Sequence, residues 1–128
     1  KPLNFLNDVV PLIRHHHERF DGSGYPDGLK ASAIPLGARI LSLCDAFETM
    51  LAGRTHFARI KLEDAIVNLH QEAGSHFDPH LVDVLFSVLY ERPEVFEVTI
   101  NGSERSCLAS YRQKMKMVGA ALQQQMFI

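Results

Sequence analysis

The 128-residue sequence contains no tryptophan and only two cysteines, Cys44 and Cys107, which lie far apart in unrelated contexts. Two isolated cysteines do not form a disulfide framework and are typical of reduced thiols in a cytoplasmic protein. No apolar run approaches the roughly 20 residues that a membrane-spanning helix requires, and no signal peptide is visible. We therefore expect a cytoplasmic protein, with no membrane association in this segment.

The sequence also lacks an excess of charge of either sign. Its formal net charge is −2 and its pI is near 6.4. Such a chain has no general electrostatic attraction to nucleic acid or to an anionic membrane, so we expect neither as a partner. Hydrophobic residues make up 46% of the chain, which is enough for one domain with its own core.

Histidine, in contrast, is concentrated in the run His15-His16-His17-Glu18, directly before a turn rich in glycine and proline at 21–28. Imidazole is the commonest metal ligand in proteins, and turns of this composition bring backbone close to a ligand. Two other interpretations are a solvated helix end, where protonated imidazole meets the helix dipole, and the remnant of an affinity tag. The turn that follows favours a cluster of metal ligands.

Residues 16–26, HHERFDGSGYP, resemble the signature of the HD-GYP domain, a branch of the HD metal-dependent phosphohydrolases. Further matching segments lie at 28–30, 34–41, 45–47, 54 and 73–79, so the resemblance covers roughly residues 5–91. Studied members of this family hydrolyse the bacterial second messenger cyclic di-GMP. The resemblance therefore implies a metal-dependent cyclic-dinucleotide phosphodiesterase that acts in bacterial signal transduction.

The resemblance implies that His16, His17 and Asp45 are metal ligands, in a site for two or three divalent transition metal ions, iron or manganese. For Asp45 the pattern gives a second reason. It lies on an otherwise apolar side of a predicted helix over 35–52, where a buried carboxylate needs a cation or hydrogen-bond donors. A salt bridge to Arg39 or Arg54 is the alternative.

The resemblance also indicates residues that contact the substrate. It places the loop containing Gly24, Tyr25 and Pro26 beside the metal site, and it aligns Arg54 with an arginine associated with the substrate phosphate. The alternatives are a solvated connecting loop and a solvent-exposed arginine, which is the commoner fate of an arginine in a loop.

Apolar spacing and capping residues predict an all-α helical bundle similar to an HD domain. We expect helices that begin at Asn7 or Asp8, at Pro35, at 62 and after Asp78-Pro79. Residues 1–92 would form the C-terminal half of an HD-GYP-like catalytic domain. Residues 93–128 would add a short hairpin over 96–108, turning at Asn101-Gly102, and a terminal amphipathic helix over 109–126. This appendage suits a homodimer or contacts with a regulatory domain.

The sequence contains no adjacent His-Asp pair, the pair that defines the family and lies upstream of the GYP motif. We therefore identify no catalytic residue in this chain and expect it to be inactive alone. Its uncovered apolar faces should bind another copy or be covered by the 109–126 helix. The alternative is a degenerate, non-catalytic module for protein or nucleotide binding. A His-Asp pair encoded upstream of Lys1 would favour the enzyme.

Overall fold

The computed structural model describes residues 6–53 and 58–126, with side chains of the last helix described as far as Lys114. Five α-helices occur in this part of the chain: α1 (Val10–His15), α2 (Leu36–Ala52), α3 (Leu62–Glu72), α4 (Pro79–Glu91) and α5 (Gly102–Met126). Two short 3-10 helices, Ala31–Ala33 and Pro93–Phe96, lie in the connections. The described residues form no β-strand, which confirms the all-α prediction.

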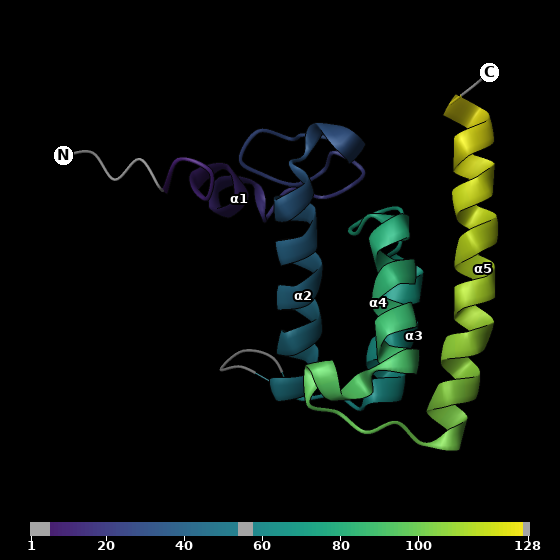
Figure 1. The fold of residues 1–128 in the computed structure, drawn as a ribbon. Coiled ribbons are helices and arrows are strands. Elements are labelled where there is room, and N and C mark those ends of the chain that lie inside the picture. The colour runs from purple at the N-terminus through teal and green to yellow at the C-terminus, as the bar shows by residue number, and fades with distance from the viewer. Residues whose placement is uncertain (1–5, 54–57, 127–128) are drawn as a thin grey trace.

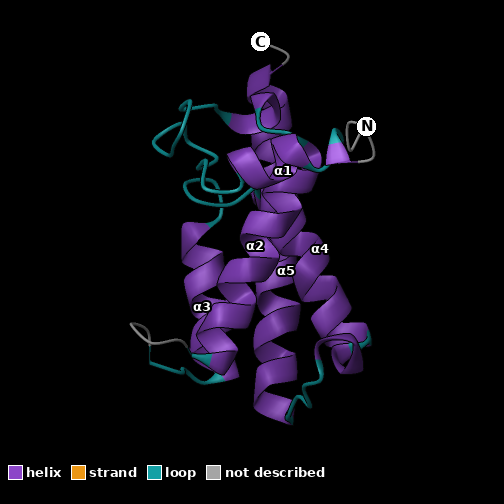
Figure 2. Cartoon of the chain, turned by 90° about the vertical axis from the view of Figure 1, so that its left-hand side faces the viewer, coloured by secondary structure: helices purple, strands orange, loops and turns teal. Residues whose placement is uncertain are grey.

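Helices α2 to α5 run along one another as a bundle, and α1 lies across the N-terminal end of α2 (Figure 1). Helices α3 and α4 separate α2 from α5, which packs against α4 and α3 (Figures 1 and 2). The long loop between α1 and α2, which contains the GYP motif, lies at the N-terminal end of α2. Within the described residues, no helix is both long and apolar enough to cross a membrane.

The hydrophobic core fills the space between α2, α3, α4 and the first half of α5. Helices α2, α3 and α4 contribute side chains three or four residues apart, the spacing of an amphipathic helix. The buried residues are Leu43, Phe47, Ala65, Ile66, Leu69, Phe77, Val82, Leu85, Phe86, Leu89 and Leu108. Since Leu108 of α5 is completely buried among them, the first half of α5 shares this core.

Helix α2 differs from its prediction, because its apolar residues are buried only in part. Leu43 and Phe47 lie in the core, and Ala38 is buried nearer the N-terminal end, whereas Leu36, Ile40 and Leu41 in the first half of the helix are exposed. Asp45 is accordingly half-buried rather than fully buried. The reason is packing: α3 and α4 contact one side of α2, and α1 contacts it elsewhere near its N-terminal end. Helix α5 packs on α4 and α3 and does not cover these exposed residues, so one of the two alternatives expected from the sequence, cover by the 109–126 helix, is wrong.

The predicted hairpin over 96–108 is wrong, because α5 already begins at Gly102. Asn101 and Glu104 form a reciprocal cap at its start. The Glu104 amide donates to Asn101 Oδ1 at 2.8 Å, and the Asn101 amide donates to Glu104 Oε1 at 2.9 Å. This is a capping box with Asn in the Ser/Thr position. The Asn-Gly pair thus starts a helix instead of turning a hairpin.

The predicted cap of α4 is confirmed. Asp78 accepts a hydrogen bond from the His80 amide at 2.9 Å, and Pro79 occupies the first turn. The same carboxylate pairs with Arg39 of α2, whose guanidinium lies 2.7 Å from Asp78 Oδ2. Arg39, which the sequence offered as one alternative partner of Asp45, therefore forms an ion pair that joins α2 to the start of α4.

Candidate metal centre

The histidine run lies where α1 ends and the GYP loop begins. Helix α1 spans only Val10–His15, begins without a side-chain cap, and has His16 as its C-terminal cap residue. His17 lies beyond the helix, and its carbonyl accepts the Tyr25 amide at 3.3 Å. The prediction of a helix starting at Asn7 or Asp8 is therefore wrong by two to three residues. His16 thus keeps helical backbone dihedrals, and His17 is the first of the two to lie in the loop.

His16 and His17 have the nitrogen atoms that a metal would need. His16 Nδ1 is hydrogen-bonded to the Ile13 carbonyl, so Nε2 remains for another ligand. This arrangement is typical of metal-binding histidines, which use their other ring nitrogen to bond a carbonyl or a carboxylate. The His17 side chain is exposed and lies against His16, with ring centroids 4.0 Å apart. Among the described residues, neither ring nitrogen of His17 has a hydrogen-bond partner.

Glu18, which follows these histidines, is buried and ties the loop together. Its carboxylate accepts hydrogen bonds from the amides of Asp27, Gly28 and Leu29 at 3.2, 2.8 and 3.2 Å. It also lies 3.0 Å from His15 Nδ1. Burial raises the pKa of this carboxyl, but the hydrogen bonds from His15 and the three amides outweigh it and leave the pKa below its usual value. Glu18 is therefore an ionised structural group inside the loop.

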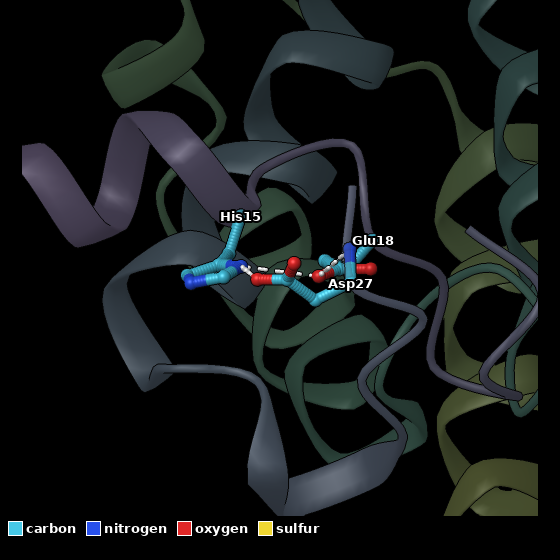
Figure 3. Close-up of side chains that lie close together, drawn as sticks. All are labelled: His15, Glu18 and Asp27. Carbon is cyan, nitrogen blue, oxygen red and sulfur yellow. Dashed lines mark hydrogen bonds and ion pairs between the residues drawn. The ribbon is translucent and has the colours of Figure 1, made fainter. Parts of the chain in front are cut away.

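In the described part of the chain, one group of side chains could hold a metal ion: donor atoms of His15, Glu18 and Asp27 lie within 4.8 Å of one another (Figure 3). Each of these three side chains already has a hydrogen-bond or ion-pair partner. Both oxygens of Glu18 accept amide hydrogens, and Asp27 pairs with Arg14 at 3.1 Å. We interpret this cluster as the hydrogen-bond network that fastens the turn at 27–29 to the end of α1.

The start of the loop is fastened to a distant part of the chain. The amides of Phe20 and Asp21 donate to the carbonyls of His76 and Ser75, at 3.0 and 2.9 Å. These two carbonyls lie in the connection between α3 and α4, within the segment 73–79 that also matched the family pattern. The GYP loop is thus anchored at both ends, so its tip can hold a fixed position.

The predicted substrate residues Gly24, Tyr25 and Pro26 form that tip. The Tyr25 ring stacks on His17, with centroids 5.1 Å apart and planes 20° apart, and 62% of Tyr25 remains exposed. Tyr25 and Pro26 also line an open groove of about 490 Å³ against α1, together with Val10, Ile13 and Arg14. The loop therefore joins a predicted metal ligand to an open groove.

Of the other two predicted site residues, the structure describes one. Asp45 is in the middle of α2 and does not belong to the cluster in Figure 3. Arg54 lies outside the described residues, so its role stays a prediction. Sequence reasoning missed His15 and Glu18, although an acid next to a turn with several free amides is a recognisable signal for such a clamp.

Comparison with known proteins agrees with this architecture. The HD domain family profile matches residues 1–81, more than half of the chain. The chain belongs to the HD domain family. This confirms the resemblance noted from the sequence, because the motif segments before residue 81 lie within the matched region.

Two curated relatives resemble this HD domain. The cyclic di-GMP phosphodiesterase response regulator RpfG of Xanthomonas campestris is 47% identical over 81 residues, which are 63% of this chain and 21% of that protein. A probable cyclic di-GMP phosphodiesterase of Vibrio cholerae is 44% identical over 78 residues, 61% of this chain and 18% of that protein. The chain thus spans about a fifth of the length of these relatives.

A solved structure shares the fold of this HD domain. It is a cyclic GMP-AMP specific phosphodiesterase from V. cholerae, with a TM-score of 0.60 and 21% identity. The match covers 84% of this chain and 29% of that one. At this level of identity, the likeness supports the helical architecture alone.

Proposed function

We propose that this chain is part of a metal-dependent phosphodiesterase that hydrolyses cyclic di-GMP. The observation that carries the proposal is the placement of His16 and His17. Two imidazoles with available nitrogens lie at the edge of an anchored loop, next to an open groove. The names of the relatives support the choice of substrate, because both are cyclic di-GMP phosphodiesterases.

In this proposal, His16, His17 and Asp45 hold divalent transition metal ions, with iron or manganese as the expected metals. Neutral imidazoles and a carboxylate are a donor set that suits these ions, and the hydrogen bond from His16 to the Ile13 carbonyl fits such a role. Such ions supply Lewis acidity toward water and phosphate oxygens. Glu18 would hold the loop in place without binding metal, because its oxygens accept amide hydrogens.

The loop tip and Arg54 would contact the cyclic dinucleotide. Gly24, Tyr25 and Pro26 border the metal ligands, and the exposed Tyr25 ring lines the groove beside them. Arg54 would bind a phosphate through two parallel hydrogen bonds, for which a guanidinium is the best suited side chain.

We further propose that residues 1–92 act as the C-terminal half of an HD-GYP-like catalytic domain, with a His-Asp half supplying the remaining ligands. The exposed apolar residues of α1 and α2, such as Ile13, Leu36 and Ile40, support this, because helices of such a half would cover them. The segment 93–128 would then serve dimerisation or contact with a regulatory domain. The two free thiols fit a cytoplasmic setting.

The test is hydrolysis of cyclic di-GMP by the full-length protein with Mn²⁺ or Fe²⁺, followed by chromatography of the products. We expect metal-dependent turnover, and the variant Arg54→Ala should lose about 10- to 100-fold in kcat/KM, the value of one charge-assisted phosphate contact. Metal content should stay unchanged in that variant. If the full-length protein hydrolysed the cyclic dinucleotide 3′3′-cGAMP but not cyclic di-GMP, the proposed substrate would be wrong, while the proposed reaction would stand. A metal-loaded protein that hydrolyses neither would refute the proposal.

A further inference from the structure

The two predicted histidine ligands differ in how their rings are held. His16 is oriented by a hydrogen bond from its ring to the Ile13 carbonyl. His17 has no such bond among the described residues, and its side chain is exposed. An exposed imidazole without a partner samples several rotamers, and that freedom must be given up when a metal binds. Something else must therefore hold His17 if it is to be a pre-oriented ligand.

The aromatic ring of Tyr25 lies against the His17 ring and can hold it in place of a hydrogen-bond partner. It stacks on His17 with centroids 5.1 Å apart and planes 20° apart, while His16 contacts the imidazole at a centroid distance of 4.0 Å. An offset stack between nearly parallel rings restricts rotation of the imidazole, yet it leaves both ring nitrogens free. It can therefore orient a ligand without competing for the atom that binds metal.

The backbone fixes this stack in advance. The Tyr25 amide donates to the His17 carbonyl at 3.3 Å, so the two residues lie side by side across the loop. Gly24 permits this approach, because a Cβ at that position would lie 2.6 Å from the His17 carbonyl oxygen and 2.7 Å from the Glu18 carbonyl carbon. The Glu18 carboxylate then holds the following turn at 27–29. These contacts of the loop backbone place the Tyr25 ring against His17.

We infer that Tyr25 is a positioning residue for His17: its ring holds the imidazole in the orientation that binds metal. This inference rests on the proposed function, because it takes His17 to be a metal ligand. It goes beyond that function by giving the exposed tyrosine of the GYP motif a role that acts through His17, in addition to bordering the groove. It also predicts that the ring, and not the hydroxyl, is what matters.

The first experiment observes the stack itself, in the 128-residue chain without metal. NMR of the histidine ring protons should show ring-current shifts for His17 in the wild type and in Tyr25→Phe, and these shifts should disappear in Tyr25→Leu. Because Tyr25 is mostly exposed, all three proteins should fold, which thermal unfolding would check. Equal His17 shifts in wild type and Tyr25→Leu would overturn the inference.

The second experiment measures Mn²⁺ affinity of the full-length protein by competition with a chelating dye. Tyr25→Phe should bind Mn²⁺ as the wild type does, whereas Tyr25→Leu should bind it about tenfold more weakly, as expected when a group that orients a ligand is removed. His17→Ala serves as the reference for loss of the ligand. If Tyr25→Leu binds Mn²⁺ like the wild type and only its KM for cyclic di-GMP rises, Tyr25 is a substrate contact and the inference is wrong, while the proposed function stands. If His17→Ala itself keeps wild-type affinity, the ligand assignment fails, and the inference fails with it.

Discussion

At the scale of single residues, the HHHE run divides into two pairs with different tasks. His16 and His17 keep ring nitrogens available, whereas His15 and Glu18 are engaged in the network that closes the loop. The resemblance singled out His16 and His17 as ligands, but the sequence did not predict the network of His15 and Glu18. Which imidazole meets the carboxylate depends on where α1 ends, and the basic residues that run from Arg14 to His17 do not mark a single end in the sequence. The sequence predicted that this stretch belongs to the site. Which of its residues form the hydrogen-bond network of the loop could be seen only from the path of the backbone.

Gly24 is the residue whose substitution should be most informative about the loop. In Gly24→Ala, the new Cβ would press on the backbone of His17 and Glu18, which cannot move aside as a side chain could. We expect a loss of about 1–3 kcal/mol in the free energy of unfolding, as for other overpacked sites, measured by urea denaturation. Gly102→Ala is the matched control, because nothing lies within 4 Å of a Cβ there. Equal stability of the two variants would contradict the packing described for Gly24.

At the scale of the elements, local signals predicted helices well where they agreed with one another. Asp78-Pro79 gave the start of α4, and the apolar spacing that begins at 62 gave the start of α3. Asn101-Gly102 misled, because the same dipeptide suits a hairpin turn and a helix start. The acid three residues after Asn101 was the signal that decided between them.

The capping box of α5 can be tested directly. Asn101→Ala should lower the free energy of unfolding by about 1 kcal/mol, because the Glu104 amide loses its acceptor. Glu104→Ala should have a smaller effect, since the Asn101 amide can bond water instead. The double variant should lose less than the sum of the two, because the bonds are reciprocal. Additive losses in a double-mutant cycle would argue against a shared cap.

The contact between α3 and α5 should make stability depend on pH through His70. Burial, together with the Lys114 ammonium, lowers the pKa of His70 below its ordinary value of 6.5, and its Nδ1 is buried without a hydrogen-bond partner among the described residues. Its ring stacks on Tyr111 of α5, with centroids 4.2 Å apart. The unfolded chain therefore takes up this proton at a higher pH than the folded chain does.

The sign of the effect follows from this order of proton uptake. The stability associated with neutral His70 is fully present above pH 6.5 and is lost as the pH falls below that value toward the lower pKa of the folded state. Urea denaturation of the wild type and of His70→Gln, at intervals between pH 7.5 and 5, would measure it. The variant should lose less stability over this range. Parallel curves would show that His70 titrates alike in both states.

At the scale of the whole molecule, the sequence predicted the family and the bundle, but it did not predict which helix sides are covered. Helix α2 is apolar on two sides, and periodicity cannot tell which residues along them meet a neighbour within the same chain. The structure leaves apolar residues in the first half of α2 open, with Leu36 54% and Ile40 43% exposed, and Ile13 of α1 is 58% exposed. Exposed large apolar side chains on two contacting helices are typical of a surface that another chain covers.

We therefore expect the 128-residue chain alone to self-associate through the exposed apolar residues of α1 and of the first half of α2. Sedimentation velocity at micromolar concentration should show dimers or larger species. The double substitution Ile13→Ser and Ile40→Ser should shift them toward monomer. Val84→Ser with Val95→Ser is the matched control, because these residues are equally exposed but lie elsewhere. A monomeric wild type would contradict this prediction, because the exposed residues would then not mediate association.

The metal content of the full-length protein tests the central claim most directly. Elemental analysis of the purified wild type should find iron or manganese, because His16, His17 and Asp45 are proposed to bind it. His17→Ala and Asp45→Ala should each lose most of that metal, whereas His80→Ala, which removes an exposed histidine of α4, should retain it. Unchanged metal stoichiometry in both His17→Ala and Asp45→Ala would contradict the ligand assignment on which the proposed phosphodiesterase depends.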